Sequence, residues 1–308
     1  MIAAAIDIGT NSVLLTVAER AGDGSVRVLA DRAEITRLGE GVDHQRRLQP
    51  AAMQRTAAAV AAFAASAREL GASRLRAVGT SALRDACNTP EFADLLRRQT
   101  GLLLEVLSGE AEALLSYRAV RDDTSLGLPP NDLIVVDIGG GSAEFIHGDA
   151  AGIRFRTSLD CGAVRTTERF FHADPPTPAE IAATAQWLDA QLATLPDFPA
   201  GAPAVGIGGT FVNLAAVESS AAQEGVASLH GTVLDQTAVA RQIARFAAMP
   251  TAQRRQIPGL EPKRADVILA GALLVQRILE RFALPAIRVS VRGLRYGVLW
   301  EILATPGP

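Results

Sequence analysis

Lysine is almost missing from this 308-residue chain, and cysteine is rare. Lys263 is the only lysine, so nearly all of the basic charge is carried by arginine. The planar fork of arginine binds phosphate through two parallel hydrogen bonds, although codon bias in a GC-rich genome would produce the same excess. Two cysteines, Cys87 and Cys161, are too few for a disulfide framework or a four-cysteine metal site.

Long hydrophobic runs are also missing. The richest apolar stretch, residues 203–217, is interrupted by glycines and an asparagine, so no membrane span is predicted. The N-terminus enters a strand at once and shows no signal-peptide order. The net charge of -3 does not suit a protein that coats nucleic acid, so any polyanion would have to be bound by a local positive field. We therefore expect a cytoplasmic protein with no membrane or nucleic-acid partner.

The chain does have enough apolar material for more than one core. Hydrophobic residues make up 48% of it, and 308 residues suffice for two domains of ordinary size. Strands come first and then alternate with helices up to about residue 121, which is typical of an α/β domain. Residues 122–132 carry glycine and two prolines and are the expected domain boundary, after which the order of elements begins again.

A short internal repeat marks the start of each predicted domain. Residues 6–12 (IDIGTNS) align without gaps on residues 136–142 (VDIGGGS), and aspartate, isoleucine, glycine and serine recur in register. One such segment could be a plain hairpin turn. Two copies, each after a strand with a buried pattern, predict a duplicated fold whose turns face a shared cleft.

The residues in these turns suit phosphate binding. Glycines let backbone N–H groups point into one small space, and such a concavity binds phosphate oxygens. Asp7 and Asp137 would repel phosphate, so they are expected to hold a divalent cation or an ordered water. Side-chain donors are available from Thr10, Asn11, Ser12 and Ser142.

Three further segments could contribute to such a site. Glu110 and Glu112 begin a predicted helix two residues apart, so only one can point inward, and either could be an ordinary helix-start acid. Arg84 follows a strand end and could bind an anion or pair with an acid on the surface. Residues 208–210 (GGT) open another helix after a buried strand but lack the spacing of a dinucleotide fingerprint and the lysine of a P-loop.

Taken in order, these segments resemble the exopolyphosphatase / guanosine pentaphosphate phosphohydrolase (Ppx/GppA) family, within the sugar kinase, actin and heat-shock chaperone superfamily. The resemblance covers nearly the whole chain. The matching segments are 5–12 (AIDIGTNS), 79–86 (GTSALRDA), 108–113 (SGEAEA), 137–144 (DIGGGSAE), 162–165 (GAVR) and 293–297 (GLRYG).

The resemblance implies an α/β fold of two actin-like (ribonuclease H-like) lobes around a central cleft, with mixed sheets flanked by helices. The N-terminal lobe would comprise residues 1–126 and 299–308, and the C-terminal lobe residues 127–298, as in the short two-domain form. It also implies a Mg²⁺-dependent homodimer that hydrolyses the terminal phosphoanhydride bonds of inorganic polyphosphate and releases orthophosphate.

Roles carried over from the family fall on individual residues. Glu112 matches the catalytic base, and Glu144 matches a second catalytic acid that places water or metal. The implied Mg²⁺ ligands are Asp7, Asp137 and Glu144. The implied phosphate-binding residues are Thr10, Asn11, Ser12, Arg84, Asp137, Gly139, Gly140, Gly141, Ser142, Gly208, Gly209 and Thr210.

Two departures from the family pattern leave the substrate preference open. Ala111 stands where a glutamate is frequent, and Tyr296 stands where a glutamate is usual. The alternatives are hydrolysis of guanosine pentaphosphate (pppGpp) at the same site, a kinase of the wider superfamily, and a non-catalytic sensor of polyphosphate or nucleotide.

Overall fold

The computed structural model describes residues 1–22, 25–219 and 225–305. The chain forms two compact units: unit 1 comprises Met1–Ala119 and Leu294–Pro308, and unit 2 comprises Val120–Gly293. The borders expected from the sequence, 126/127 and 298/299, lie a few residues further along the chain. Within the described part of the chain, no helix combines the length and the apolar character that a membrane span needs.

Unit 1 is built on a five-stranded sheet in the order β3-β2-β1-β4-β5. The first three strands pair antiparallel, whereas β4 and β5 continue the sheet parallel to β1. The turns after β1, β4 and β5 therefore meet at one edge of the sheet, the usual place for a ligand site in an α/β fold. The strands are β1 (Ile2–Ile8), β2 (Ser12–Arg20), β3 (Val26–Ile35), β4 (Arg74–Gly79) and β5 (Leu104–Val106).

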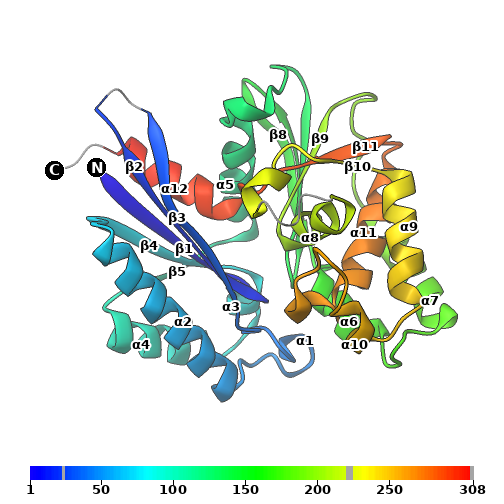
Figure 1. Ribbon diagram of the computed structural model, residues 1–308, viewed down its shortest axis with the longest axis horizontal. Coiled ribbons are helices and arrows are strands. Elements are labelled where there is room, and N and C mark those ends of the chain that lie inside the picture. Colours follow the sequence, from blue (N-terminus) through cyan, green and yellow to red (C-terminus); the bar gives the residue numbers. More distant parts are fainter. Residues whose placement is uncertain (23–24, 220–224, 306–308) are drawn as a thin grey trace. The chain divides into compact units, whose positions relative to one another are not determined.

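Helices cover both faces of this sheet (Figure 1). Along β1, Ala4, Ile6 and Ile8 belong to the core under α2, whereas Ala3 and Ala5 belong to the core under α12. This alternation follows from the two-residue period of a strand. The helices are α1 (Val42–Gln45), α2 (Pro50–Glu69), α3 (Ser81–Asp85), α4 (Thr89–Thr100), α5 (Gly109–Arg121) and α12 (Leu294–Ala304). Residues 39–47 are polar and contain glycine, a composition that predicts a loop, but the structure forms the short helix α1 there.

Arginines of the sheet hold the end of α12 in unit 1. Arg20 donates to the carbonyl of Leu303 at 2.8 Å, and Arg74 donates to that of Thr305 at 2.8 Å. The last carbonyls of a helix have no partner inside the helix, so these bonds satisfy them.

Unit 2 repeats the strand order of unit 1. Its six-stranded sheet has the order β10-β11-β9-β6-β7-β8, and three strands starting from β6 again pair antiparallel while β9 and β11 follow in parallel. Read from β8, the order β8-β7-β6-β9-β11 matches the order β3-β2-β1-β4-β5 of unit 1. In this match β11 takes the place of β5, and β10 is an additional strand at the edge. The duplication predicted from the repeat is therefore confirmed. The strands are β6 (Leu133–Ile138), β7 (Ala143–Asp149), β8 (Gly152–Leu159), β9 (Ala204–Ile207), β10 (Val233–Asp235) and β11 (Ala286–Val289).

One helix forms the centre of the helical layer of unit 2. The apolar sequence of α11 is buried along most of its length, because it packs against α6, α7, α8 and α9. The helices are α6 (Ala163–Phe170), α7 (Pro178–Leu192), α8 (Gly209–Glu218), α9 (Gln236–Ala247), α10 (Thr251–Arg254) and α11 (Ile268–Arg281). Short 3₁₀ turns occur at η1 (Thr124–Leu126), η3 (Val226–Leu229) and η4 (Pro262–Arg264).

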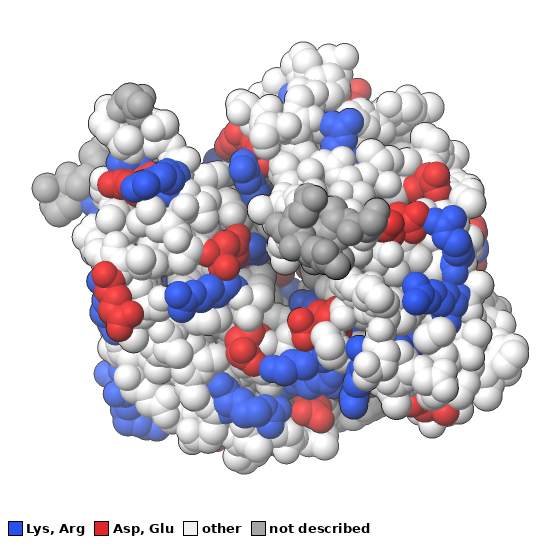
Figure 2. Space-filling view, in the orientation of Figure 1, with Lys and Arg blue, Asp and Glu red and all other residues white. Residues whose placement is uncertain are grey.

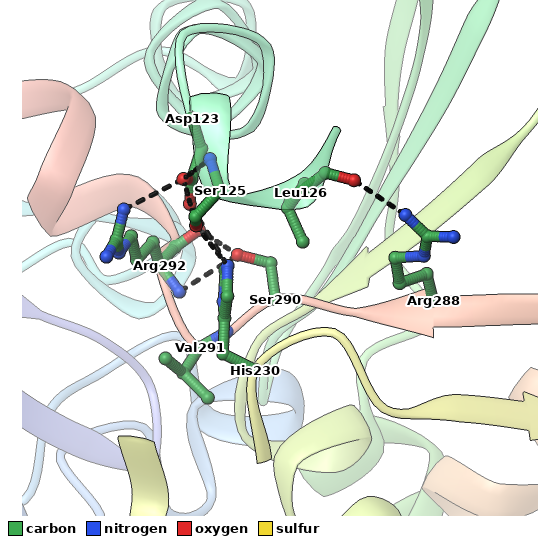
Figure 3. A network of polar contacts seen from close by, with 8 residues as sticks. All are labelled: Asp123, Ser125, Leu126, His230, Arg288, Ser290, Val291 and Arg292. Carbon is green, nitrogen blue, oxygen red and sulfur yellow. Dashed lines mark hydrogen bonds and ion pairs between the residues drawn. The ribbon is translucent and has the colours of Figure 1, made fainter. Parts of the chain in front are cut away.

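A polar network in unit 2 joins the segment after α5 to the segment before α12 (Figure 3). The side chain of Asp123 is only 1% exposed and accepts a hydrogen bond from Arg292 at 2.8 Å. His230 Nε2 lies 3.2 Å from the other carboxylate oxygen, and Arg288 donates to the carbonyl of Leu126 at 2.6 Å. His230 thus has a structural role, and the four histidines of the chain are scattered in the sequence without the spacing of metal ligands.

Candidate active site

The first turn, Gly9–Ser12, connects β1 and β2. The N–H of Gly9 donates to the carbonyl of Ser12 at 2.9 Å. The carbonyl of Thr10 accepts from Gly39, and that of Asn11 accepts from two N–H groups of the segment after β3. In a planar trans peptide the N–H points away from the preceding carbonyl. The N–H groups of Asn11 and Ser12 therefore face away from that segment.

Side chains of the first turn are almost fully buried. Thr10, Asn11 and Ser12 are 8%, 5% and 7% exposed. Both polar atoms of the Asn11 side chain lack a hydrogen-bond partner among the described residues. Buried amides are nearly always hydrogen-bonded in folded proteins, so this amide is suited to a water or ligand oxygen.

The second turn, Gly139–Ser142, connects β6 and β7 in the same way. The N–H of Gly139 donates to the carbonyl of Ser142 at 3.0 Å, the same bond as in the first turn. The carbonyls of its three glycines all accept hydrogen bonds from the start of α6. The N–H groups of Gly140, Gly141 and Ser142 consequently point away from α6. Three successive N–H groups on one side form a nest for an anion.

Two residues of the segment at α6 hold the second turn in place. A Cβ on Gly162 would lie 2.5 Å from the backbone of Gly140, so only glycine permits this approach. Arg165 is 8% exposed and donates from Nε to the carbonyl of Gly141 at 2.8 Å. The sequence showed these residues as part of a motif but indicated no role for Arg165.

The GGT turn, Gly208–Thr210, lies beside the second turn in unit 2. Gly208 has φ +91°, and a Cβ there would lie 2.7 Å from Asp137 Oδ1 and 2.6 Å from the carbonyl of Ile138. The opposite side of the turn is packed as well, since a Cβ on Gly209 would meet the Arg264 guanidinium at 2.2 Å. The structure thus places Gly208 beside Asp137 and the second turn, whereas the side chain of Thr210 lies against Gly271 on α11.

Two carboxylates lie next to each other in this group. Asp137 on β6 is directly paired with Glu144 on β7, and the side chains are 9% and 0% exposed. Carboxylates facing each other across a strand pair repel. A divalent cation would relieve the repulsion, and Mg²⁺ is commonly held by one or two carboxylates together with substrate phosphates and water. This pair fits such an ion. No group of three possible ligands occurs among the described residues.

In unit 1, the structure distinguishes the two glutamates at the start of α5. Glu112 is 7% exposed, whereas Glu110 is exposed. Arg84 donates from Nη1 to Glu112 Oε2 at 2.6 Å and to the carbonyl of Leu107 at 3.0 Å. The expected base and the expected phosphate-binding arginine therefore form an ion pair with each other.

Among the described residues, Arg84 forms no ion pair with the neighbouring surface acids Asp85 and Glu91. Asp85 lies 3.8 Å from Arg46, and Glu91 lies 3.4 Å from Arg47. Both acids have other partners, and the Arg84 side chain is only 23% exposed.

Unit 1 presents a buried glutamate held by an arginine, and unit 2 presents an N–H nest beside two carboxylates. Asp7 lies in unit 1, so an ion shared with Asp137 and Glu144 stays a prediction. Nests, arginines and carboxylates are the groups that enzymes use to transfer phosphoryl groups. The duplicated actin-like fold and these groups define an enzyme that handles phosphate esters or anhydrides.

The chain belongs to the Ppx/GppA phosphatase family, whose model matches residues 16–305. Exopolyphosphatase 2 of Mycobacterium tuberculosis is 34% identical over 312 residues, which cover 96% of each chain. The guanosine-5'-triphosphate,3'-diphosphate pyrophosphatase of Vibrio cholerae is 32% identical, over 97% of this chain and 59% of its own length.

Solved structures agree with this assignment. A Ppx/GppA family member from Aquifex aeolicus has a TM-score of 0.83 and 35% identity, covering 100% of this chain and 99% of its own. An exopolyphosphatase from Cytophaga hutchinsonii has a TM-score of 0.89 and 26% identity, covering 98% of both chains. The family, the fold class and the enzyme class, a phosphoanhydride hydrolase, are thereby confirmed.

Proposed function

We propose that this chain is an exopolyphosphatase that hydrolyses the terminal phosphoanhydride bond of inorganic polyphosphate and releases orthophosphate. The main support is the second turn, where three successive N–H groups lie beside the buried pair Asp137 and Glu144. The full-length similarity to a mycobacterial protein named exopolyphosphatase supports the choice of substrate.

In the proposed reaction, water attacks the terminal phosphorus in line and Glu112 takes its proton. Burial and the bond from Arg84 give the Glu112 carboxylate one orientation. Both hydrogen bonds that Arg84 makes with described residues use Nη1, so Nη2 and Nε could donate to a phosphate oxygen. One guanidinium can thus position the base and stabilise charge on the transferred group.

The phosphate oxygens would be held by the N–H groups of the second turn. The first turn would add the N–H groups of Asn11 and Ser12 and the buried amide of Asn11, and the GGT turn would support the substrate phosphates from β9. These groups are backbone donors of defined direction, so they need little rearrangement when negative charge moves during the reaction.

Members of this family generally depend on a divalent metal ion. We propose Mg²⁺ for this chain, held by Asp137 and Glu144, with Asp7 as a further ligand. When bound, the ion would offset negative charge on the substrate phosphates. Without it, the two facing carboxylates would repel the polyanion that the N–H nest attracts.

A second candidate substrate is pppGpp, because the Vibrio cholerae relative carries the name of that activity. Its terminal bond is also a phosphoanhydride, so the same base, nest and carboxylates would serve. This chain covers only 59% of that relative, whereas it covers 96% of the mycobacterial exopolyphosphatase, and we therefore rank polyphosphate first.

The remaining proposals concern the setting of the enzyme. We propose a cytoplasmic homodimer without nucleic-acid or membrane partners. On the face shown in Figure 2, basic and acidic side chains are interspersed, and the net charge is -3. Such a distribution supports recognition of polyphosphate by a local site, because broad binding of polyanions needs an extended basic surface.

Phosphate release from polyphosphate and from pppGpp tests the proposal, with Mg²⁺ present and no phosphoryl acceptor. The wild type is compared with Glu112→Gln, which keeps the shape of the side chain and removes the base. Glu110→Gln is the matched control, since it makes the same change on the exposed side of the same helix. We expect turnover to fall about 10²–10⁴-fold for Glu112→Gln and to be unchanged for Glu110→Gln.

The possible outcomes separate the alternatives. Faster release from pppGpp than from polyphosphate would favour the second substrate. Tight polyphosphate binding without any phosphate release would favour a sensor, and dependence on an added acceptor would favour a kinase. Wild-type kcat in Glu112→Gln would show that Glu112 is not the base.

A further inference from the structure

Three polar residues form a row across neighbouring strands of the sheet in unit 2. Asp137 on β6 is paired with Glu144 on β7, and Glu144 is paired with Ser158 on β8. Directly opposed residues of antiparallel strands have side chains on the same face of the sheet. This face is opposite the main core of the unit, to which Phe145 and Leu159 on the same strands contribute.

The middle residue of the row is in an unfavourable place for a carboxylate. Glu144 is 0% exposed and faces Asp137. The buried Arg165 donates its Nε to the carbonyl of Gly141 in the second turn.

Ser158 provides a direct donor to this carboxylate. Its hydroxyl donates to Glu144 Oε1 at 2.8 Å. A hydrogen bond to an ionised oxygen is about twice as strong as one between neutral groups. Because the donor comes from the paired position on the next strand, it also restricts rotation of the Glu144 carboxylate about its terminal torsion.

We propose that Ser158 is a positioning residue: its hydroxyl fixes the plane of the Glu144 carboxylate beside Asp137, so that the two carboxylates can hold one divalent cation. This proposal rests on the proposed function for its catalytic consequence but not for ion binding. Partners that orient metal ligands through hydrogen bonds typically change metal affinity or activity about 10–100-fold when they are removed.

Binding of Mn²⁺ to the full-length protein without substrate tests the proposal directly. Free Mn²⁺ is measured by electron paramagnetic resonance for the wild type, Ser158→Ala and Ser158→Thr. Thr157→Ala is the matched control, because it removes a hydroxyl from the opposite face of the same strand. We expect Ser158→Ala to weaken Mn²⁺ binding about 10–100-fold, and Ser158→Thr and Thr157→Ala to bind nearly as the wild type does.

Kinetics with polyphosphate give the second readout. Ser158→Ala should lower kcat with little change in KM, because the N–H nest that holds the phosphate stays intact, and Ser158→Thr should restore kcat. Wild-type Mn²⁺ affinity in Ser158→Ala, failure of Ser158→Thr to restore it, or no Mn²⁺ binding by the wild type would overturn the proposal. Ser158-dependent Mn²⁺ binding in a protein that releases no phosphate would instead refute only the proposed function.

Discussion

Replacing Asp123 by asparagine should remove a defined, pH-dependent part of the stability of unit 2. Burial alone would raise the pKa of Asp123, but hydrogen bonds from His230 and Ser125 and the charge of Arg292 outweigh it and lower the pKa from 3.8 to about 2. The side chain is 1% exposed, so solvent screens these contacts little.

The direction of the pH effect follows from this shift. The pKa in the folded state is below that in the unfolded state, so the ionised Asp123 stabilises the fold fully above about pH 4. This contribution is lost as the pH falls through about 2. At about 1.4 kcal/mol per pKa unit, the shift corresponds to about 2 kcal/mol of unfolding free energy at neutral pH.

Each unit contains one of the two tryptophans, which makes the effect measurable in unit 2 alone. Trp187 lies on α7 in unit 2 and Trp300 on α12 in unit 1. In a Trp300→Phe background, urea unfolding followed by Trp187 fluorescence would be recorded from pH 7 to pH 2.5, with and without Asp123→Asn.

We expect Asp123→Asn to lower the free energy of unfolding by about 2 kcal/mol at pH 7, with the difference disappearing towards pH 2. The matched control is Asp122→Asn, the exposed neighbouring residue, which should have no such effect. Parallel stability curves for Asp123→Asn and its background between pH 7 and pH 2.5 would refute the reasoning.

Three further predictions follow from the site. Gly162→Ala should raise KM for polyphosphate about tenfold, because the new Cβ would lie 2.5 Å from the backbone of Gly140 and displace the N–H nest. An unchanged KM would contradict this prediction. Burial raises the pKa of the Cys161 thiol, whereas Cys87 is exposed. Iodoacetamide at pH 8 should therefore label only Cys87 in the folded protein and both thiols in urea. Labelling of both thiols in the folded protein would contradict this prediction. Arg84→Ala should raise KM for polyphosphate about 10–100-fold, and Arg84→Lys should raise it less, because lysine keeps the positive charge. Equal KM values for the two variants would argue against a contact between Arg84 and a substrate phosphate.

Much of the architecture could be predicted from local sequence patterns. The two seven-residue repeats, each after a strand with a buried pattern, indicated a duplicated fold, and the structure shows the same strand order twice and the same hydrogen bond across each turn. The glycines at 139–141 predicted a phosphate-binding turn, because a residue without a Cβ lets a ligand approach the backbone closely in any fold.

Which side chains act together depended on contacts far apart in the chain. Helical spacing showed that only one of Glu110 and Glu112 could point inward, and the family resemblance indicated Glu112. The structure buries Glu112 and leaves Glu110 exposed. The pairing of Arg84 with Glu112 and of Ser158 with Glu144 follows from how strands and helices pack, which no local pattern records.

The amino-acid sequence by itself thus determined the repeat, the glycine turns and the kinds of groups available, because backbone preferences are local. The tertiary structure alone decided which carboxylates lose contact with water and which donors hold them, because desolvation and strand register depend on residues that meet only in the folded chain.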